Sequence, residues 1–279
     1  MHPTRTHRER RASLDGYFQP ESVIRRLGNE PLVPLLGGGP AVLMQVAHPL
    51  VAAGVMRHSD FHENLWRRLI GTLRALYLIA FGTKAEADRV GETVQAVHRS
   101  VVGRTQEPIG RYPCGTRYDA SDPELMLWVH ATLVHSSLAV YSRLVGSLSD
   151  EEQEQYYREM ALVARIFGTP AGVLPPTLAD FHEYLRAELD GRDLCVGRAA
   201  RDVAAVILRA RVPPPLLPAV PAHRLSTAAM LPERLRQEYG LWWSPAHAAA
   251  LAVSARSLRL VVSPLLLAAA RVAPIPQAA

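Results

Sequence analysis

The helical spacing of apolar residues constrains the fold of this chain more than any other sequence feature. Leucines recur every three or four residues between positions 63 and 81, and a similar stripe of valines lies between positions 84 and 102. This spacing places the apolar side chains on one face of an α-helix. No segment shows the sustained alternation of apolar and polar residues that is typical of a half-buried strand. We therefore predict an all-α protein.

Capping signals predict where three further helices begin. Each consists of a short polar residue followed by a residue that favours the first helical turn. The predicted helices run to about positions 145, 167 and 191. The three signals are Asp122 with Pro123, Ser149 with Glu152, and Thr177 with Asp180.

A glycine-rich stretch lies at positions 37–40, "GGGP". We predict a tight turn here, followed by a helix with Pro40 near its first turn. That helix should break at His48, because Pro49 disfavours the α conformation of the residue before it. The stretch lacks the Lys-Ser/Thr ending of a phosphate-binding loop, so a nucleotide site is not predicted.

Length and composition favour one large domain. The chain has 279 residues, of which 48% are hydrophobic, enough to build a sizeable core. We predict a basic N-terminal tail and lead-in over residues 1–29 and a single all-helical domain over residues 30–279. A proline-rich linker at 212–222 would lead to the C-terminal helices of the same domain.

Charge and cysteine content indicate which classes of partner the protein binds and in which cellular compartment it lies. The net charge is +5, but the basic residues are dispersed, so we predict no nucleic-acid binding. Two cysteines, Cys114 and Cys195, fit a reducing compartment, and we predict a cytoplasmic protein. The apolar tract near the C-terminus contains Pro264 and is too short to span a bilayer alone. An interfacial helix in peripheral contact with a membrane stays open.

Three residues on neighbouring helices are candidates for haem chemistry. His98 lies beside a valine stripe, and an apolar helix face with one imidazole can present an axial ligand to haem iron. Arg68 and Thr72 are four residues apart, so they share a helix face, where Arg68 could clamp a carboxylate. Each residue also has a structural alternative. His98 could be an ordinary core histidine, Arg68 could form an interhelical salt bridge, and the Thr72 hydroxyl could bond to a carbonyl of its own helix.

His48 and Gln45 form a second candidate group. His48 sits at the predicted helix boundary, where a side chain can be aimed into a cavity, and Gln45 precedes it by three residues. The alternative is that His48 ties down backbone groups left free by Pro49. His130 and His135 are five apart and point in different directions on a helix, so they are poor partners for one metal. The zinc-protease and di-iron ligand spacings are absent from the sequence.

Several motifs in order resemble one family. They are "GGGPAVLMQVAHPLVAAGVMRHSDF", "RLIGTLRALYLIAFG", "VHRSVVG", "DPELMLWVHATLVHS" and "YYREM…FGTP…LPPTLADFHEYL". Together they are similar to the haem-dependent oxygenase family of the bacterial latex-clearing rubber oxygenases. That family includes the fungal oxygenase that cleaves a farnesyl side chain in mycophenolic acid biosynthesis. The resemblance covers about residues 30–260.

The resemblance implies a globin-like helical core with additional helices around a pocket for haem b. It implies that His98 is the proximal iron ligand and that Arg68 and Thr72 belong to the haem-pocket helix. His48 and Gln45 match the family's Gln-x-x-His element. The resemblance thus gives Arg68, Thr72 and His48 as catalytic candidates. Rubber oxygenases carry a distal lysine where this chain has Gly71, and "LVAAGV" lacks their pocket acid.

We therefore predict a haem b-dependent oxygenase that uses dioxygen on a small apolar substrate, such as an alkene or an isoprenoid. Its electron donor is not specified by the sequence. The first alternative is a haem-binding carrier or sensor without oxygenase activity, which the missing lysine and acid favour. The second is a structural or membrane-surface helical protein that keeps the pattern for packing.

Overall fold

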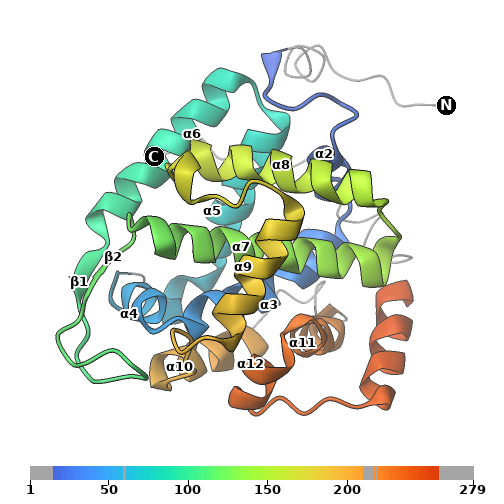
Figure 1. The fold of residues 1–279 in the computed structure, drawn as a ribbon. Helices are drawn as coiled ribbons and strands as arrows, with labels where there is room; N and C mark the ends of the chain where they lie inside the picture. The colour runs from blue at the N-terminus through green and yellow to red at the C-terminus, as the bar shows by residue number, and fades with distance from the viewer. Residues whose placement is uncertain (1–14, 59–60, 210–216, 218, 258–279) are drawn as a thin grey trace.

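A computed structural model describes residues 15–58, 61–209, 217 and 219–257, with side chains for all of these except 61–70 and 219. Residues 1–14 of the predicted basic tail and lead-in lie outside the described residues, and so do most of the proline-rich linker and the apolar tract after residue 257. Figure 1 shows the other helices packed around two central helices, α3 and α7, whose bounds are given below.

The described part of the chain is helical nearly throughout, which confirms the predicted all-α class. The labelled helices are α2 (Val23–Gly28), α3 (Leu32–Ala47), α4 (Pro49–His58), α5 (Phe61–Phe81), α6 (Lys84–Ser100), α7 (Pro123–Val140), α8 (Asp150–Ile166), α9 (Leu178–Asp190), α10 (Arg198–Leu208), α11 (Ala219–Met230) and α12 (Glu233–Glu238). A π-helical turn, Tyr141–Val145, extends α7, and a 3-10 turn covers Ala171–Val173. Strands β1 (Val102–Arg104) and β2 (Arg117–Asp119) pair antiparallel.

Helices α3 and α7 form the centre of the core. They pack against each other, and α3 also packs against α10 and α11. The indole of Trp128 on α7 is buried and donates a hydrogen bond to the Gln45 carbonyl on α3 over 3.3 Å. In the part of the chain that the structure describes, the one helix apolar and long enough to cross a membrane is Pro123–Val145. Within the fold, 61% of its apolar window is buried, as in a core helix.

The predicted turn at the glycine-rich stretch is wrong. Gly37 to Gly39 and Pro40 lie inside α3, which begins at Leu32. The reason is long-range packing, because α11 crosses α3 at the glycines. A Cβ built on Gly39 would lie 2.3 Å from Thr227 Oγ1 and 2.8 Å from the His223 ring. The glycine therefore serves close helix approach, which outweighs its poor helix propensity.

Pro40 is tolerated inside α3 because α11 replaces the hydrogen bond that proline removes. A proline has no N–H to offer the carbonyl four residues earlier, here that of Leu36. Ser226 on α11 donates its hydroxyl to this carbonyl over 3.0 Å. His223 bonds similarly to the carbonyl of Leu35 over 3.3 Å. The α3–α11 contact thus supplies hydrogen bonds to backbone carbonyls beside the stretch that was predicted to form a turn.

The α3–α11 contact gives a prediction about stability. Gly39→Ala should lower the free energy of unfolding by about 1–3 kcal/mol, because the new methyl overpacks the contact with Thr227 and His223. Gly37→Ala is the matched control in the same helix, since its Cβ would meet Val140 at an ordinary 3.7 Å. Denaturant unfolding of both variants measures the difference. Equal unfolding midpoints with equal slopes would contradict the overpacking.

The predicted capping signals are confirmed. Asp122 accepts from the Glu124 N–H over 2.9 Å at the start of α7. Ser149 with Glu152 and Thr177 with Asp180 form complete capping boxes at α8 and α9. The proline-rich linker was predicted to extend to residue 222, but α11 begins at Ala219. Pro221 falls in its first turn, where a missing N–H costs little.

The small hairpin is the exception to the helical pattern. The valine stripe continues to residue 102, but α6 ends at Ser100 and Val102 begins β1. Gly103 pairs with Tyr118 of β2. A Cβ on Gly103 would lie 2.4 Å from the Tyr118 hydroxyl, so this glycine serves a close side-chain approach. Strands of three residues are too short to show an alternating sequence pattern.

Candidate functional site

Helices α5 and α6 form a hairpin and carry the residues that sequence analysis singled out. The two helices pack against each other, and a short turn at Gly82 and Thr83 joins them (Figure 1). Thr83 caps α6 by accepting from the Glu86 N–H over 3.2 Å, while the Glu86 carboxylate accepts from the Thr83 N–H over 2.9 Å. This capping box fixes the register at which α6 leaves the turn.

His98 lies in the last turn of α6, just before β1. Its side chain is half-buried, and its Nδ1 atom is shielded from solvent. The neighbouring Val97 is 55% exposed, which is unusual for a large apolar side chain on a packed helix. An imidazole beside apolar surface that the described residues leave open is a suitable donor for a large planar cofactor.

Thr72 and Gly71 lie on α5, and both are exposed. Among the described residues, a Cβ built on Gly71 would meet nothing within 4 Å, at the position where the resemblance leads us to expect a lysine. Tyr77, further along α5, is 58% exposed. The backbone of Arg68 belongs to α5, but its side chain is outside the described residues. That Arg68 and Thr72 share a helix face stays a prediction.

Arg74 on α5 is a residue that the sequence analysis missed. Its Nε atom is shielded from solvent and has no hydrogen-bond partner. A buried guanidinium nitrogen without an acceptor is costly, and it marks a place where a carboxylate could bind. The signal in the sequence was an arginine in an otherwise apolar stretch, "LRALYLIAF". Such an arginine usually keeps its head group in water, so the pattern alone did not distinguish it.

His48 belongs to a different network, at the bend between α3 and α4. Its Nδ1 accepts from the Leu50 N–H over 3.3 Å, so Nε2 carries the proton and donates to Tyr112 Oη over 3.2 Å. Tyr112 in turn donates to Asp193 over 2.9 Å, and Arg111 forms an ion pair with Asp193. Both ring nitrogens of His48 are therefore engaged in this conformation. The bond from Leu50 supports the alternative in which His48 ties down backbone beside Pro49.

Burial governs the protonation of this network. Desolvation lowers the pKa of His48 to about 4, with Asp193 opposing the shift. Desolvation likewise raises the pKa of Tyr112 to about 12. At neutral pH His48 is uncharged and Tyr112 keeps its proton. Gln45 is half-buried, and its backbone carbonyl accepts the bond from Trp128.

His130 on α7 also has a buried nitrogen that no described residue hydrogen-bonds. Its side chain is 5% exposed, and its Nε2 has no hydrogen-bond partner. Desolvation lowers the pKa of His130 to about 4. His135 instead bonds to the Met230 carbonyl over 3.3 Å, so the two histidines have different surroundings. Among the described residues, no three His, Cys, Asp or Glu side chains gather as a metal site.

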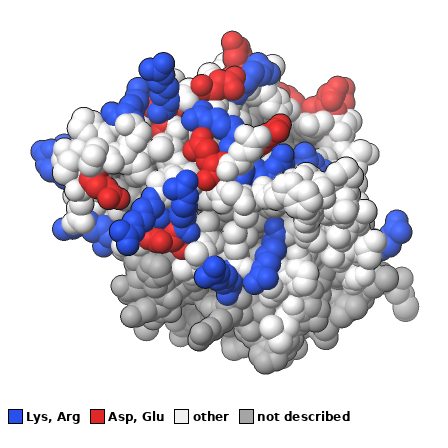
Figure 2. Space-filling model, turned by 90° about the horizontal axis from the view of Figure 1, so that it is seen from below, with Lys and Arg blue, Asp and Glu red and all other residues white. Residues whose placement is uncertain are grey.

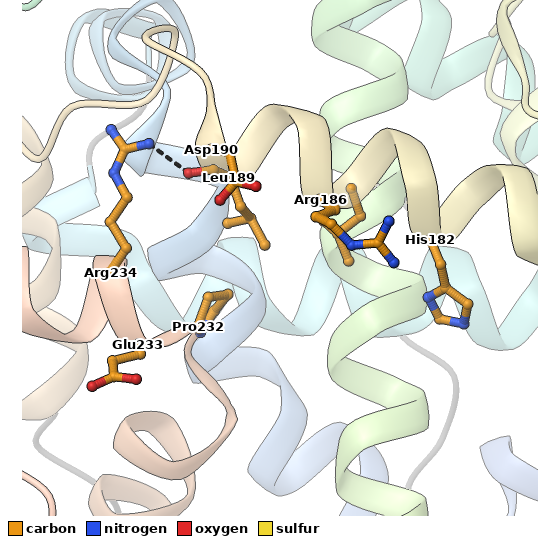
Figure 3. Close-up of a pocket in the computed structure, with 8 residues that line it drawn as sticks. His182, Arg186, Leu189, Asp190, Pro232, Glu233 and Arg234 are labelled. Carbon is orange, nitrogen blue, oxygen red and sulfur yellow. Dashed lines mark hydrogen bonds between the residues drawn. The ribbon is translucent and has the colours of Figure 1, made fainter.

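A cleft lies elsewhere, between α9 and the start of α12. Its volume is about 480 Å³, and Figure 3 shows charged side chains from both helices around it. Arg234 at this cleft donates to the carbonyls of Gly191 and Leu194 over 2.7 and 3.0 Å, so it is engaged in joining α12 to the end of α9. Four of its eight lining residues carry a charge, so the lining mixes charged and apolar groups. The other lining residues are His182, Leu185, Arg186, Leu189, Asp190, Pro232 and Glu233.

Comparison with known proteins defines the class to which this helical fold belongs. Residues 25–260 match the family described as "ER-bound oxygenase mpaB/B'/Rubber oxygenase, catalytic domain". The chain belongs to this oxygenase family, as the ordered motifs predicted. An uncharacterized protein of Mycobacterium tuberculosis and one of Mycobacterium bovis are each 30% identical to it over 215 residues. Each match covers 74% of this chain and 80% of the relative. No solved structure matches the chain.

The described residues of the α5–α6 hairpin include the types of donor that a haem group needs. Haem requires one protein imidazole, partners for its two carboxylates and an apolar surface. The α5–α6 hairpin offers His98, an unsatisfied Arg74 nitrogen and exposed apolar side chains at Val97 and Tyr77. His98 thus supplies an imidazole for the iron, and Arg74 supplies a guanidinium nitrogen for a haem carboxylate. Haem iron does not need a cluster of several protein ligands.

Proposed function

We propose that this protein is a haem b-dependent oxygenase that acts on a small apolar substrate containing a carbon–carbon double bond. The observation that carries the proposal is the match of residues 25–260 to an oxygenase catalytic domain. The α5–α6 hairpin supports it, because His98 and Arg74 stand on two paired helices. When bound, haem iron would supply the activation of dioxygen, which amino-acid side chains do not provide.

His98 would bind the iron through Nε2 and leave Nδ1 toward the protein. A proximal histidine needs its Nδ1–H directed at an acceptor, because that bond fixes the ring and raises its basicity. The Nδ1 atom of His98 is shielded from solvent, as this role requires. Its place in the last turn of α6 also gives the ring a rigid backbone support.

Arginines on α5 would hold the haem carboxylates. Guanidinium groups bind carboxylates through two parallel hydrogen bonds. Arg74 has the unsatisfied nitrogen for such a bond. Arg68 is proposed for the same task from the family pattern, and Thr72 is proposed to hydrogen-bond a polar atom beside the iron. The absence of a side chain at Gly71 would leave room for substrate on that face.

Arg74 gives a prediction that is independent of turnover. Arg74→Ala should weaken hemin binding by about 10- to 150-fold, because one charge-assisted carboxylate contact contributes about 1.5–3 kcal/mol. Arg74→Lys should recover only part of the loss, since lysine makes no forked contact. Titration of the apoprotein with hemin measures the affinity. Arg186→Ala on α9 is the control, and equal affinities for all these variants would exclude the carboxylate role.

Turnover distinguishes the oxygenase from a carrier or sensor. The haem-loaded protein should consume dioxygen and convert a short isoprenoid alkene into carbonyl products, detected by mass spectrometry with ¹⁸O₂. The same mixture under argon is the control. Haem binding without oxygen-dependent product, across linear and branched alkenes, would favour the carrier or sensor.

A further inference from the structure

The segment that follows α12 carries an exposed apolar surface. Residues 245–257 form a helix at the edge of the fold, the unlabelled orange-red helix at the lower right of Figure 1. Leu251 and Ala255 face inward and are buried. We call the opposite side, together with the tryptophan that precedes it, the C-terminal apolar face. It consists of Trp242, Ala246, Ala249, Ala250 and Val253.

The composition of this face is unusual for a helix that meets water. The outer face of a surface helix normally carries charged residues. Residues 245–255 contain no Asp, Glu, Lys or Arg. Trp242 is 76% exposed and Val253 is 68% exposed. Two large apolar side chains and several alanines exposed on one segment indicate that another apolar medium covers them.

The charge of the segment indicates what that medium is. Residues 239–279 contain three arginines, Arg256, Arg259 and Arg271, and no Asp or Glu. They account for +3 of the chain's net charge of +5, since the chain has 31 basic and 26 acidic residues. Arg256 is exposed and follows Val253 by three positions, so it lies near the end of the same face. A purely basic, apolar segment complements a surface that is both anionic and apolar.

We propose that the C-terminal apolar face docks on the surface of a lipid bilayer that contains anionic lipids. Tryptophan prefers the boundary between lipid head groups and acyl chains, and arginine beside it is attracted by anionic head groups. The Trp242 ring meets the edge of His247, with 5.0 Å between centroids, while Trp243 stacks on His247 at 5.7 Å. Ser244 holds that imidazole through a 2.7 Å hydrogen bond. The aromatic group is thus positioned at the start of the helix.

Figure 2 shows the charged side chains on one face of the described part of the molecule. In Figure 2, basic and acidic side chains are interspersed over the described part of the view. A mixed surface of that kind gives little net attraction to an anionic membrane, because the opposite charges offset each other within a screening length. Residues 239–279 contain no carboxylate side chain to offset their arginines, so this segment is suited to orient the protein on a bilayer. This inference does not depend on haem or on turnover.

Vesicle binding by the full chain tests the proposal. We expect binding to vesicles of phosphatidylcholine mixed with phosphatidylglycerol to be about tenfold or more tighter than to phosphatidylcholine alone, and to weaken in high salt. Tryptophan fluorescence should shift to the blue on binding, and Trp242→Phe should remove most of that shift. Ala249→Glu should weaken binding about tenfold, because it places a carboxylate on the docking face.

Ala85→Glu is the matched control for Ala249→Glu. It makes the same chemical change at an exposed position in the first turn of α6, and it alters the net charge equally. This variant should bind anionic vesicles within about twofold of the unmodified protein. Three results would overturn the proposal: no vesicle binding, equal weakening by both variants, or a dimer without vesicles that Ala249→Glu dissociates. The last would identify a second copy of the chain as the occupant.

Discussion

His98→Gly should abolish tight hemin binding. Loss of a second-shell partner of a metal ligand costs about 10- to 100-fold in affinity, so loss of the proposed proximal ligand should cost at least about 100-fold. The Soret band of the reconstituted variant should be that of free or weakly held hemin. Exogenous imidazole should enter the space left by the side chain and restore the ligand field of the unmodified protein.

Imidazole rescue separates ligation from general damage to the fold. His182→Ala on α9 is the control, because it removes an exposed histidine from another helix. Its hemin affinity should stay within about twofold of the unmodified protein, since it removes no ligand. If His98→Gly keeps the affinity and the spectrum of the unmodified protein, the iron ligand is another residue.

Acidification should destabilise the protein strongly between pH 7 and pH 5. Burial lowers the pKa of His48 and of His130 to about 4, whereas an unfolded histidine titrates near 6.5. The unfolded chain therefore binds more protons in this window, so the free energy of unfolding falls as the pH falls. The expected loss is about 2 kcal/mol for each histidine and about 4 kcal/mol for both. Burial also lowers the pKa of His135, His182 and His223, with the same sign.

His130→Leu isolates one of these contributions. It should remove about half of the expected loss, because the titrating ring is gone. Its stability at pH 7 should not fall, since leucine replaces a buried nitrogen that has no hydrogen-bond partner. Denaturant unfolding at pH 7 and pH 5 measures both effects. An unchanged pH dependence in this variant would show that His130 is protonated or solvated in the folded state.

Local signals predicted most of the helix boundaries. Capping boxes act within four residues, so Thr177 with Asp180 predicted the start of α9 without any tertiary information. The leucine spacing likewise predicted α5, because the spacing of apolar residues within one segment is enough to define the apolar face of a helix. The resemblance predicted the family, which the match over residues 25–260 confirmed.

The sequence-based predictions were wrong or incomplete where contacts between residues far apart in sequence determine the structure. The glycines of α3 were predicted to form a turn because their partners, Thr227 and His223, lie far away in sequence. The bond from Ser226 to the Leu36 carbonyl spans 190 residues. The pairing of His48 with Tyr112 spans 64 residues, and no local pattern indicates it. Arg74 was missed because burial of a guanidinium nitrogen is a property of packing.

The visible spectrum of the purified protein, expressed with a haem precursor, tests the central claim most directly. We expect a strong Soret band that shifts on reduction with dithionite and again on addition of carbon monoxide, as for histidine-ligated haem with an open site. The Soret absorbance should give one haem per chain. A colourless protein that gains no Soret band after titration with hemin would contradict the proposal of a haem oxygenase.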